Sequence, residues 1–241
     1  MRFLVALLAL FLVPGSAVAC WDGLLLIAAL RDIWLSLSAG MVAGAILYFL
    51  VIRKVSVVST FEHELTHALV ALLFFRRIHK FIVTRNRGGQ VQYSGNFGGQ
   101  FGDLMIGLAP YFLPTFTLIS ALVRPFLPAN WFPWFDGFIG FTFAYHFLSN
   151  IEETRLSWTK RSFTGAGDRQ KTKSDIGKTG YILAFLVILG FGLFLYGMIF
   201  HLISSGYPGL WAFIKLVVVV SFTIYAGLFT QVYSFVRSQL N

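Results

Sequence analysis

Charged residues are scarce in this sequence. They make up 12% of its 241 residues, whereas hydrophobic residues make up 57%. A soluble domain carries roughly a quarter charged residues. Apolar runs close to the ~20 residues that cross a bilayer recur along the whole chain. The composition argues against a soluble globular protein and predicts an all-α polytopic membrane protein with about six transmembrane helices.

Cysteine is almost absent, because Cys20 is the only one. A single cysteine excludes a disulfide framework and a cysteine-based metal site within one chain. The sequence also lacks internal repeats and any stretch long and polar enough to form a soluble domain. We therefore expect residues 20–241 to form a single membrane-embedded domain.

Acidic residues are outnumbered by basic ones, and the net charge is +9. Most of the excess Lys and Arg lies in short loops between apolar runs, where it sets topology by the positive-inside rule. Some of it can meet anionic lipid headgroups. The charge therefore indicates the lipid bilayer as a partner and not a nucleic acid.

The first twenty residues, MRFLVALLALFLVPGSAVAC, have one basic residue, an apolar run and a small-residue Ala-Val-Ala segment. This layout is typical of a secretory signal peptide with its cleavage site. A retained first membrane helix fits it as well. Residues 1–19 are thus either a signal peptide or the first span.

Further spans are expected from the apolar runs at 34–52, 57–75, 107–123, 137–148, 181–202 and 211–233. The run at 107–123 is interrupted by Pro110 and Pro114, and proline kinks a helix. The Gly-rich segment 81–100 alternates around Gly88-Gly89 and predicts a β-hairpin. The longest polar loop is expected from Asn150 to Lys178.

The stretch FEHELTHALV, residues 61–70, places ionisable groups inside one of these apolar runs. His63 and His67 are spaced i, i+4, so they share one helical face and both reach a single ion. In zinc hydrolases with an H-E-x-x-H motif, the glutamate is the general base, here Glu64. Zinc lowers the pKa of a bound water to about 7.

Ionisable residues in a membrane helix are costly and therefore functional by default. The alternative is a helix whose polar face lines a water pocket or packs on other polar groups. A catalytic zinc site normally has three protein ligands, so a third is needed. We expect His79 and His201 to be interfacial or packing residues, and His146 to be a buried histidine or a residue that supports the site.

The HELTH helix, the following Gly-Gly-Gln-Val hairpin and the further spans resemble the site-2-protease class of intramembrane zinc metallopeptidases. The resemblance covers roughly residues 57–180, and the HExxH motif is its specific part. It implies that the third ligand is an aspartate from a later segment. Asp136 lies in Asn-Trp-Phe-Pro-Trp-Phe-Asp-Gly, which resembles the longer motif of this class with a shortened spacer. Asp175 lies in Ser-Asp-x3-Thr-Gly, which resembles the compact branch without a PDZ domain.

Topology favours Asp175 over Asp136, with Asp168 as a third option. The basic loop before Asp175 should be cytoplasmic, and so should the start of the HELTH helix after Arg53 and Lys54. However, the basic residues 76, 77 and 80 follow the same helix and also favour the cytoplasm. Either that helix does not fully cross the membrane, or the segments after it re-enter.

Two further features have structural and functional interpretations. Gly88-Gly89 belongs either to an ordinary hairpin turn or to an edge strand that binds substrate by strand addition. Asn150 and Glu152 either polarise the site or form a solvated helix end.

The sequence therefore predicts an intramembrane zinc metalloendopeptidase that hydrolyses membrane-anchored proteins, with zinc on His63, His67 and Asp175 and with Glu64 as general base. A non-catalytic membrane scaffold or chaperone that keeps the metal site is one alternative. An ion- or proton-handling transporter is another. We expect a multi-pass integral protein of a bacterial inner membrane.

Overall fold

The protein is described by a computed structural model that covers residues 2–84, 89–163 and 175–240. These residues are mostly helical. The long helices are α1 (Arg2–Ala29), α2 (Arg31–Leu50), α3 (Ser56–Leu73), α4 (Gly99–Phe112), α5 (Thr115–Val123), α6 (Phe132–Phe163) and α8 (Tyr181–Leu240). Short 3₁₀ turns η1 (Ile52–Lys54), η2 (Arg124–Phe126) and η3 (Ala129–Trp131) and the short helix α7 (Asp175–Thr179) connect them.

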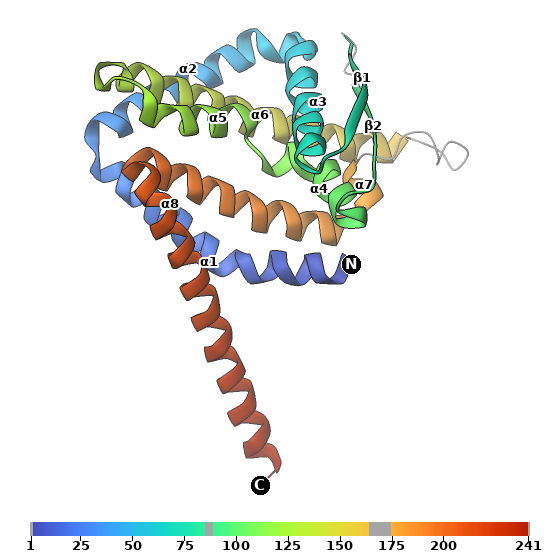
Figure 1. The fold of residues 1–241 in the computed structure, drawn as a ribbon, viewed down its shortest axis with the longest axis vertical. Coiled ribbons are helices and arrows are strands. Elements are labelled where there is room, and N and C mark those ends of the chain that lie inside the picture. The colour runs from blue at the N-terminus through green and yellow to red at the C-terminus, as the bar shows by residue number, and fades with distance from the viewer. Residues whose placement is uncertain (1, 85–88, 164–174, 241) are drawn as a thin grey trace.

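The predicted hairpin after the HELTH helix is confirmed. Strand β1 (Arg77–Val83) pairs antiparallel with β2 (Gly89–Ser94), with Val83 opposite Gly89 at the turn end. Gly88 lies outside the described residues. The hairpin stands beside α3 (Figure 1).

Six spans are not confirmed. Three described helices are long and apolar enough to cross a membrane, or four if the bent pair of α4 and α5 forms one span. This pair bends by 81° at Leu113-Pro114, where Pro114 becomes the N-cap of α5. Pro110 stays within α4. The break is therefore at only one of the two prolines that were expected to interrupt this run.

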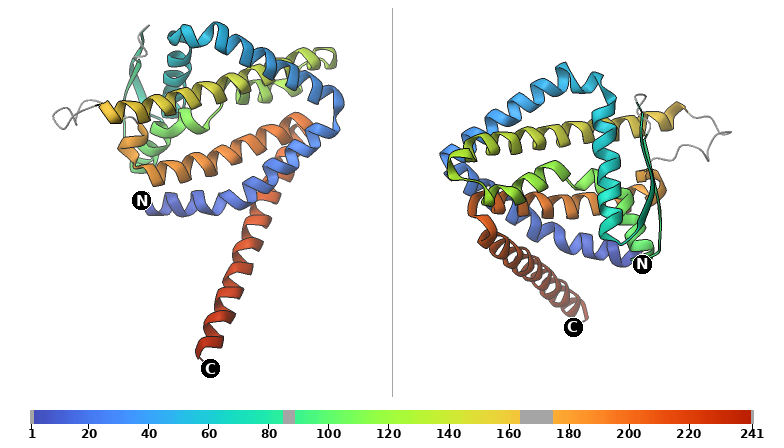
Figure 2. Two further views of the ribbon diagram at one scale, coloured as in Figure 1. Left: turned by 180° about the vertical axis from the view of Figure 1, so that it is seen from behind. Right: turned by 45° about the horizontal axis from the view of Figure 1, so that its top comes forward.

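Helix α8 is too long to be a single span, because the 57 residues of its apolar part would extend roughly 86 Å at 1.5 Å per residue. Its backbone leaves helical geometry at Gly206 (φ 63°, ψ −157°). This break lies between the two expected spans at 181–202 and 211–233. The C-terminal part projects away from the other helices (Figures 1 and 2).

Glycines let α2 and α6 pack backbone to backbone. A Cβ at Gly40 would collide with the Gly137 backbone, and one at Gly140 with the Leu37 backbone. Such small residues are typical of helix contacts in membranes, because they allow close approach. The contact fixes α6 along α2, and thereby the polar side chains that α6 carries near its other end.

Helix α3 does not run alongside the layered helices. It lies across one end of the layers formed by α1, α8, α5, α6 and α2, next to the hairpin and α7 (Figures 1 and 2). It is not among the described helices that are long and apolar enough to cross a membrane. Basic residues on both sides of α3 therefore lie at the same end of the molecule, which removes the topological conflict posed by the sequence.

The prediction of a polar loop from Asn150 to Lys178 is wrong for its first part. Helix α6 continues through Asn150 to Phe163. The residues after Asn150 are good helix formers such as Glu152, Glu153 and Arg155, and no Gly or Pro interrupts them. Helix α6 consequently carries His146 and Asn150 on a regular, rigid element.

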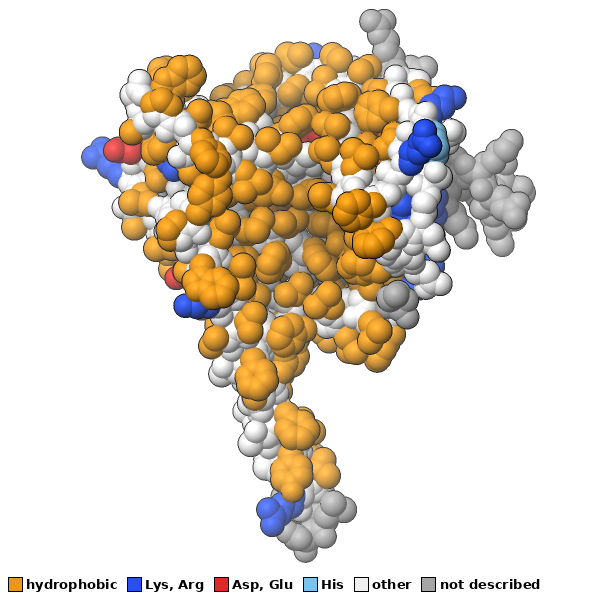
Figure 3. All heavy atoms as spheres, viewed as in Figure 1, with side chains coloured by type: hydrophobic (Ala, Val, Ile, Leu, Met, Phe, Trp, Pro, Cys, Tyr) orange, Lys and Arg blue, Asp and Glu red, His pale blue; other side chains and the backbone are white. Residues whose placement is uncertain are grey.

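Hydrophobic side chains cover most of the face in Figure 3, while basic side chains gather beside the hairpin. Large exposed apolar residues occur on all the layered helices, such as Phe49 on α2 and Phe185 on α8. Such a surface suits contact with lipid, and the chain is an integral membrane protein.

Helix α1 runs unbroken through the Ala-Val-Ala segment and packs along α8. The Gly15 backbone N–H donates to Ser221 Oγ at 3.1 Å, and Ala9 and Ala19 are fully buried. Within the structure residues 2–19 are thus part of the helical body, and removal of residues 1–19 as a signal peptide stays a prediction.

Candidate metal centre

Helix α3 brings His63 and His67 onto one face, as the i, i+4 spacing predicts. Their Nε2 atoms lie 3.1 Å apart. His67 is held from behind, because its Nδ1–H donates to the Ile106 carbonyl on α4 at 2.6 Å. This bond leaves the Nε2 lone pair free to bind a metal, which is the usual arrangement around a ligating histidine.

Asp175, the first residue of α7, completes a three-residue cluster. Its Oδ2 lies 3.9 Å from His63 Nε2 and 3.7 Å from His67 Nε2. All the donor atoms of the cluster lie within 4.8 Å of one another. Ligands about 2.0–2.2 Å from a tetrahedral zinc ion are separated by roughly 3.3 Å. The spacing and the two-imidazole, one-carboxylate donor set therefore fit zinc.

The Asp175 carboxyl is kept ionised. Burial would raise its pKa, but the nearby His63 and His67 rings and the hydrogen bond from Lys178 outweigh this effect and hold the pKa well below its usual range. Lys178 Nζ lies 2.8 Å from Oδ1, which leaves Oδ2 directed at the histidines. Asp175 is therefore a carboxylate at neutral pH, the form that binds a cation.

Glu64 is buried and lines a cavity of about 230 Å³ that also contains His63 and Asp175. Burial raises the pKa of its carboxyl above the ordinary value, and the two neighbouring histidines partly offset the rise. A general base works best when its pKa lies near the operating pH. Glu64 is thus placed to exchange a proton with a group in this cavity.

Gly89, the first residue of β2, lies directly against Glu64. A Cβ at this position would collide with the Glu64 Cγ and Oε1 atoms. The hairpin therefore limits where the Glu64 carboxylate can lie, and a glycine is needed for the strand to approach so closely.

Replacing Gly89 by Ala should reduce the peptide hydrolysis that the HExxH motif predicts about 10–100-fold, because an added methyl would displace the Glu64 carboxylate by a distance that matters for catalysis. Zinc content should be unchanged, since the three atoms nearest to a Cβ at Gly89 all belong to Glu64 and none to the cluster. Gly107→Ala is the matched control, because a Cβ there meets open space. Cleavage of a membrane-anchored reporter measures the hydrolysis, and metal analysis measures the zinc content. Equal activities of the two variants would contradict the role of Gly89.

The other candidate residues are not part of the cluster. Asp136 is buried in an ion pair with Arg124, whose Nη2 lies 2.9 Å from Oδ2. His79 is on the hairpin and contacts Ser94 Oγ. His201 contacts the Ala19 carbonyl at 3.1 Å. Asp168 lies outside the described residues.

Sequence reasoning missed the residues that support the site by backbone or ring contacts. The Ile106 carbonyl orients His67, and the Tyr111 ring packs edge-on against His63 with centroids 5.7 Å apart. Neither contact has a sequence signal. Any residue offers a backbone carbonyl, and no motif marks Tyr111 as a neighbour of His63. His146, considered as a supporting residue, does line the site cavity.

Residues 37–131 match the Peptidase M50B-like family, a site-2-protease family, and this confirms the resemblance seen in the sequence. The matched part contains α3 with the HELTH motif, the hairpin, α4 and α5. It ends before Asp136, His146 and Asp175. Comparison with curated proteins and with solved structures found no match.

Proposed function

We propose that the protein is an intramembrane zinc metallopeptidase. The observation that carries this proposal is the convergence of His63, His67 and Asp175 donor atoms within 4.8 Å, with Glu64 in the same cavity. The cluster joins residues more than a hundred positions apart in the chain. The Peptidase M50B-like match independently favours peptide hydrolysis.

Zinc bound to these residues would supply Lewis acidity towards water and the substrate carbonyl. Glu64 would accept the proton of the attacking water and then donate it to the leaving amine nitrogen as the peptide C–N bond breaks. The Ile106 carbonyl would keep His67 in the tautomer that binds metal. The ionised Asp175 would provide the negative ligand.

The substrate would be a membrane-anchored protein whose helix unwinds locally, because a peptide bond in an intact helix is shielded. An unwound segment exposes N–H and C=O groups that need partners in a low-dielectric site. The two-stranded sheet offers edges that are not paired within the sheet, and β2 begins at Gly89, directly against the Glu64 side chain. Strand addition to this hairpin would satisfy such groups. The cell membrane of a bacterium is the proposed location.

The two alternatives predict different residue distributions. A transporter needs ionisable groups spread along a path across the bilayer, whereas this cluster lies at one end of the helical layers. A scaffold that has lost turnover needs no buried carboxylate beside the metal ligands, and Glu64 is present. The hydrolase therefore accounts for more of the site than either alternative.

Zinc analysis of the detergent-purified protein, together with cleavage of a membrane-anchored reporter, tests the proposal. We expect the wild-type protein to bind about one zinc per chain and to cleave the reporter. The His63→Ala variant should lose both the zinc and the cleavage. His79→Ala is the matched control, because that histidine lies on the hairpin outside the cluster. If the wild-type protein binds no zinc after mild purification, the proposal that it is a zinc hydrolase is wrong.

A further inference from the structure

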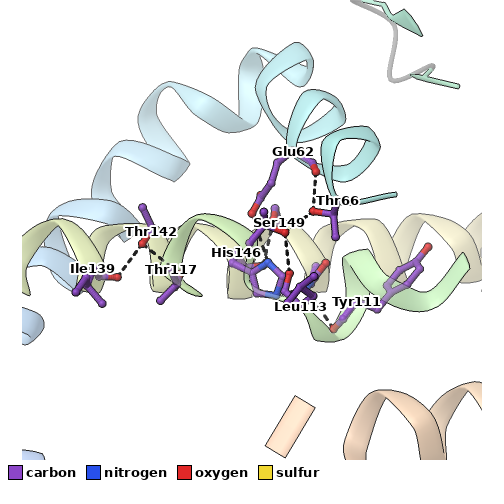
Figure 4. Close-up of polar contacts among 11 residues, drawn as sticks. Glu62, Thr66, Tyr111, Leu113, Thr117, Ile139, Thr142, His146 and Ser149 are labelled. Carbon is purple, nitrogen blue, oxygen red and sulfur yellow. Dashed lines mark hydrogen bonds and ion pairs between the residues drawn. The ribbon is translucent and has the colours of Figure 1, made fainter. Parts of the chain in front are cut away.

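A second group of buried polar residues connects α6 to α3 beside the metal centre. His146 is 3% exposed, and its Nδ1 lies 3.5 Å from Oε1 of the buried Glu62. Asn150, one turn further along α6, lies with Nδ2 2.9 Å from His146 Nε2. Figure 4 shows the side chain of Glu62 reaching from α3 towards His146. None of these residues is a proposed ligand or base.

The chemistry of the three groups fixes where the hydrogens lie. The Asn150 NH₂ group only donates, so His146 Nε2 must be the unprotonated acceptor and Nδ1 carries the proton that faces Glu62. The Asn150 amide also approaches the Tyr111 carbonyl, with Nδ2 3.4 Å from that oxygen. The Tyr111 carbonyl can only accept, so a flipped amide would place Oδ1 against another acceptor.

Asn150 Oδ1 therefore remains as an acceptor. Among the described residues no donor bonds to it. Asn150 lines the cavity that holds His63 and Glu64, and it also lines a larger apolar groove of about 780 Å³ between α6 and α8. The groove walls include Phe147, Ile188 and Leu193. Asn150 thus stands where an apolar space meets the metal centre.

Tyr111 marks the same junction from α4. It lines the groove, and its ring lies edge-on to His63. A polypeptide that lies in the groove would therefore pass Asn150 and Tyr111 on its way to the cluster. An unwound peptide in such a space loses the water that would satisfy its N–H groups, so one fixed acceptor there is favourable.

We infer that Asn150 binds substrate, accepting a backbone N–H of the unwound segment at Oδ1, and that Glu62 and His146 are positioning residues that fix its amide. The inference rests on the proposed function and names the side, between α6 and α8, from which the peptide reaches the metal centre. The alternative occupant of the groove, a lipid acyl chain, would need no acceptor at Asn150.

Peptide binding to the zinc-loaded Glu64→Gln protein tests this inference without turnover. The probe is a fluorescent synthetic peptide with one apolar segment of about 20 residues and a central Asn-Gly helix break. We expect Asn150→Leu to raise the Kd about tenfold, the effect of one hydrogen bond. His146→Phe should act similarly, and His146→Gln should restore binding because its amide both donates and accepts.

A second series of peptides, each with one central amide replaced by an ester, identifies the N–H. The ester that replaces the recognised N–H should weaken peptide binding to the Glu64→Gln protein. The same ester should not weaken binding further in the double variant that also carries Asn150→Leu. Ser149→Ala is the matched control, since Ser149 lines the same cavity but donates only to the His146 carbonyl. It should bind the peptide within about twofold of its parent.

Three results would overturn the inference: no peptide binding by the Glu64→Gln protein, unchanged binding by Asn150→Leu, or a loss that merely follows loss of zinc. Failure of the proposed function gives a different result, which is the absence of zinc from the wild-type protein. If the protein binds no zinc but binds the peptide in a way that depends on Asn150, the role of Asn150 in peptide binding stands and the proposed hydrolase function is rejected.

Discussion

Replacing Asp175 by Asn should remove zinc from the protein. Oδ2 of Asp175 lies 3.7 Å from His67 Nε2 and 3.9 Å from His63 Nε2, and an amide is a much poorer zinc ligand than a carboxylate. Mutation of a residue that only hydrogen-bonds to a metal ligand lowers metal affinity by ~10–100-fold. We expect loss of the ligand itself to lower the zinc affinity by more than this. Metal analysis after dialysis against a zinc buffer, with hydrolysis measured in parallel, records the loss.

Asp136→Asn is the control for this substitution, because the sequence offers Asp136 as the rival ligand. We expect zinc to be retained. Stability should fall instead, since the change leaves the buried Arg124 guanidinium without its carboxylate partner. Breaking a buried ion pair typically costs about 3–5 kcal/mol, which thermal unfolding in detergent detects.

The two aspartate variants thus have opposite expected results. Zinc lost with Asp136→Asn and kept with Asp175→Asn would contradict the cluster seen in the structure. Zinc kept in both variants would mean that the third ligand lies elsewhere in the chain.

Glu64→Gln should abolish hydrolysis while zinc stays bound. The carboxylate lies in the cluster cavity but is not one of the three cluster residues, and glutamine cannot take up a proton. Losing the general base typically costs about 10²–10⁴-fold in rate. Reporter cleavage and metal content, measured on the same preparation, separate catalysis from metal binding.

Glu62→Gln is the matched control, because Glu62 is a buried glutamate on the same helix that faces His146 instead of the cluster. It should retain zinc and kcat, and any change should be a rise in KM, because Glu62 helps to position the substrate-binding Asn150 and does not act on the water. Activity that survives Glu64→Gln would reject Glu64 as the base.

Much of the metal centre could be predicted from local sequence. The four-residue spacing of His63 and His67 determines their relation on any helix, and the structure shows their Nε2 atoms 3.1 Å apart. The hairpin was equally readable, because glycines and alternating residues specify it locally. The Peptidase M50B-like match covers this same part of the chain.

The third residue of the cluster depends on contacts that are distant in sequence. Asp136 has the more familiar Asp-Gly setting, but Arg124 pairs with it in the fold. Only the packing of α7 against α4 places Asp175 beside α3. The role of Gly89 is likewise decided by how closely the hairpin approaches Glu64.

Composition alone determined that this is a membrane protein, and spacing alone determined the His63–Glu64–His67 face, because both depend on residues close together in the chain. The tertiary structure decided that α3 lies across the end of the helical layers, that α6 extends past Asn150, and that Asp175 completes the cluster. These outcomes depend on which apolar surfaces pack together, and helix packing is a property of the whole chain.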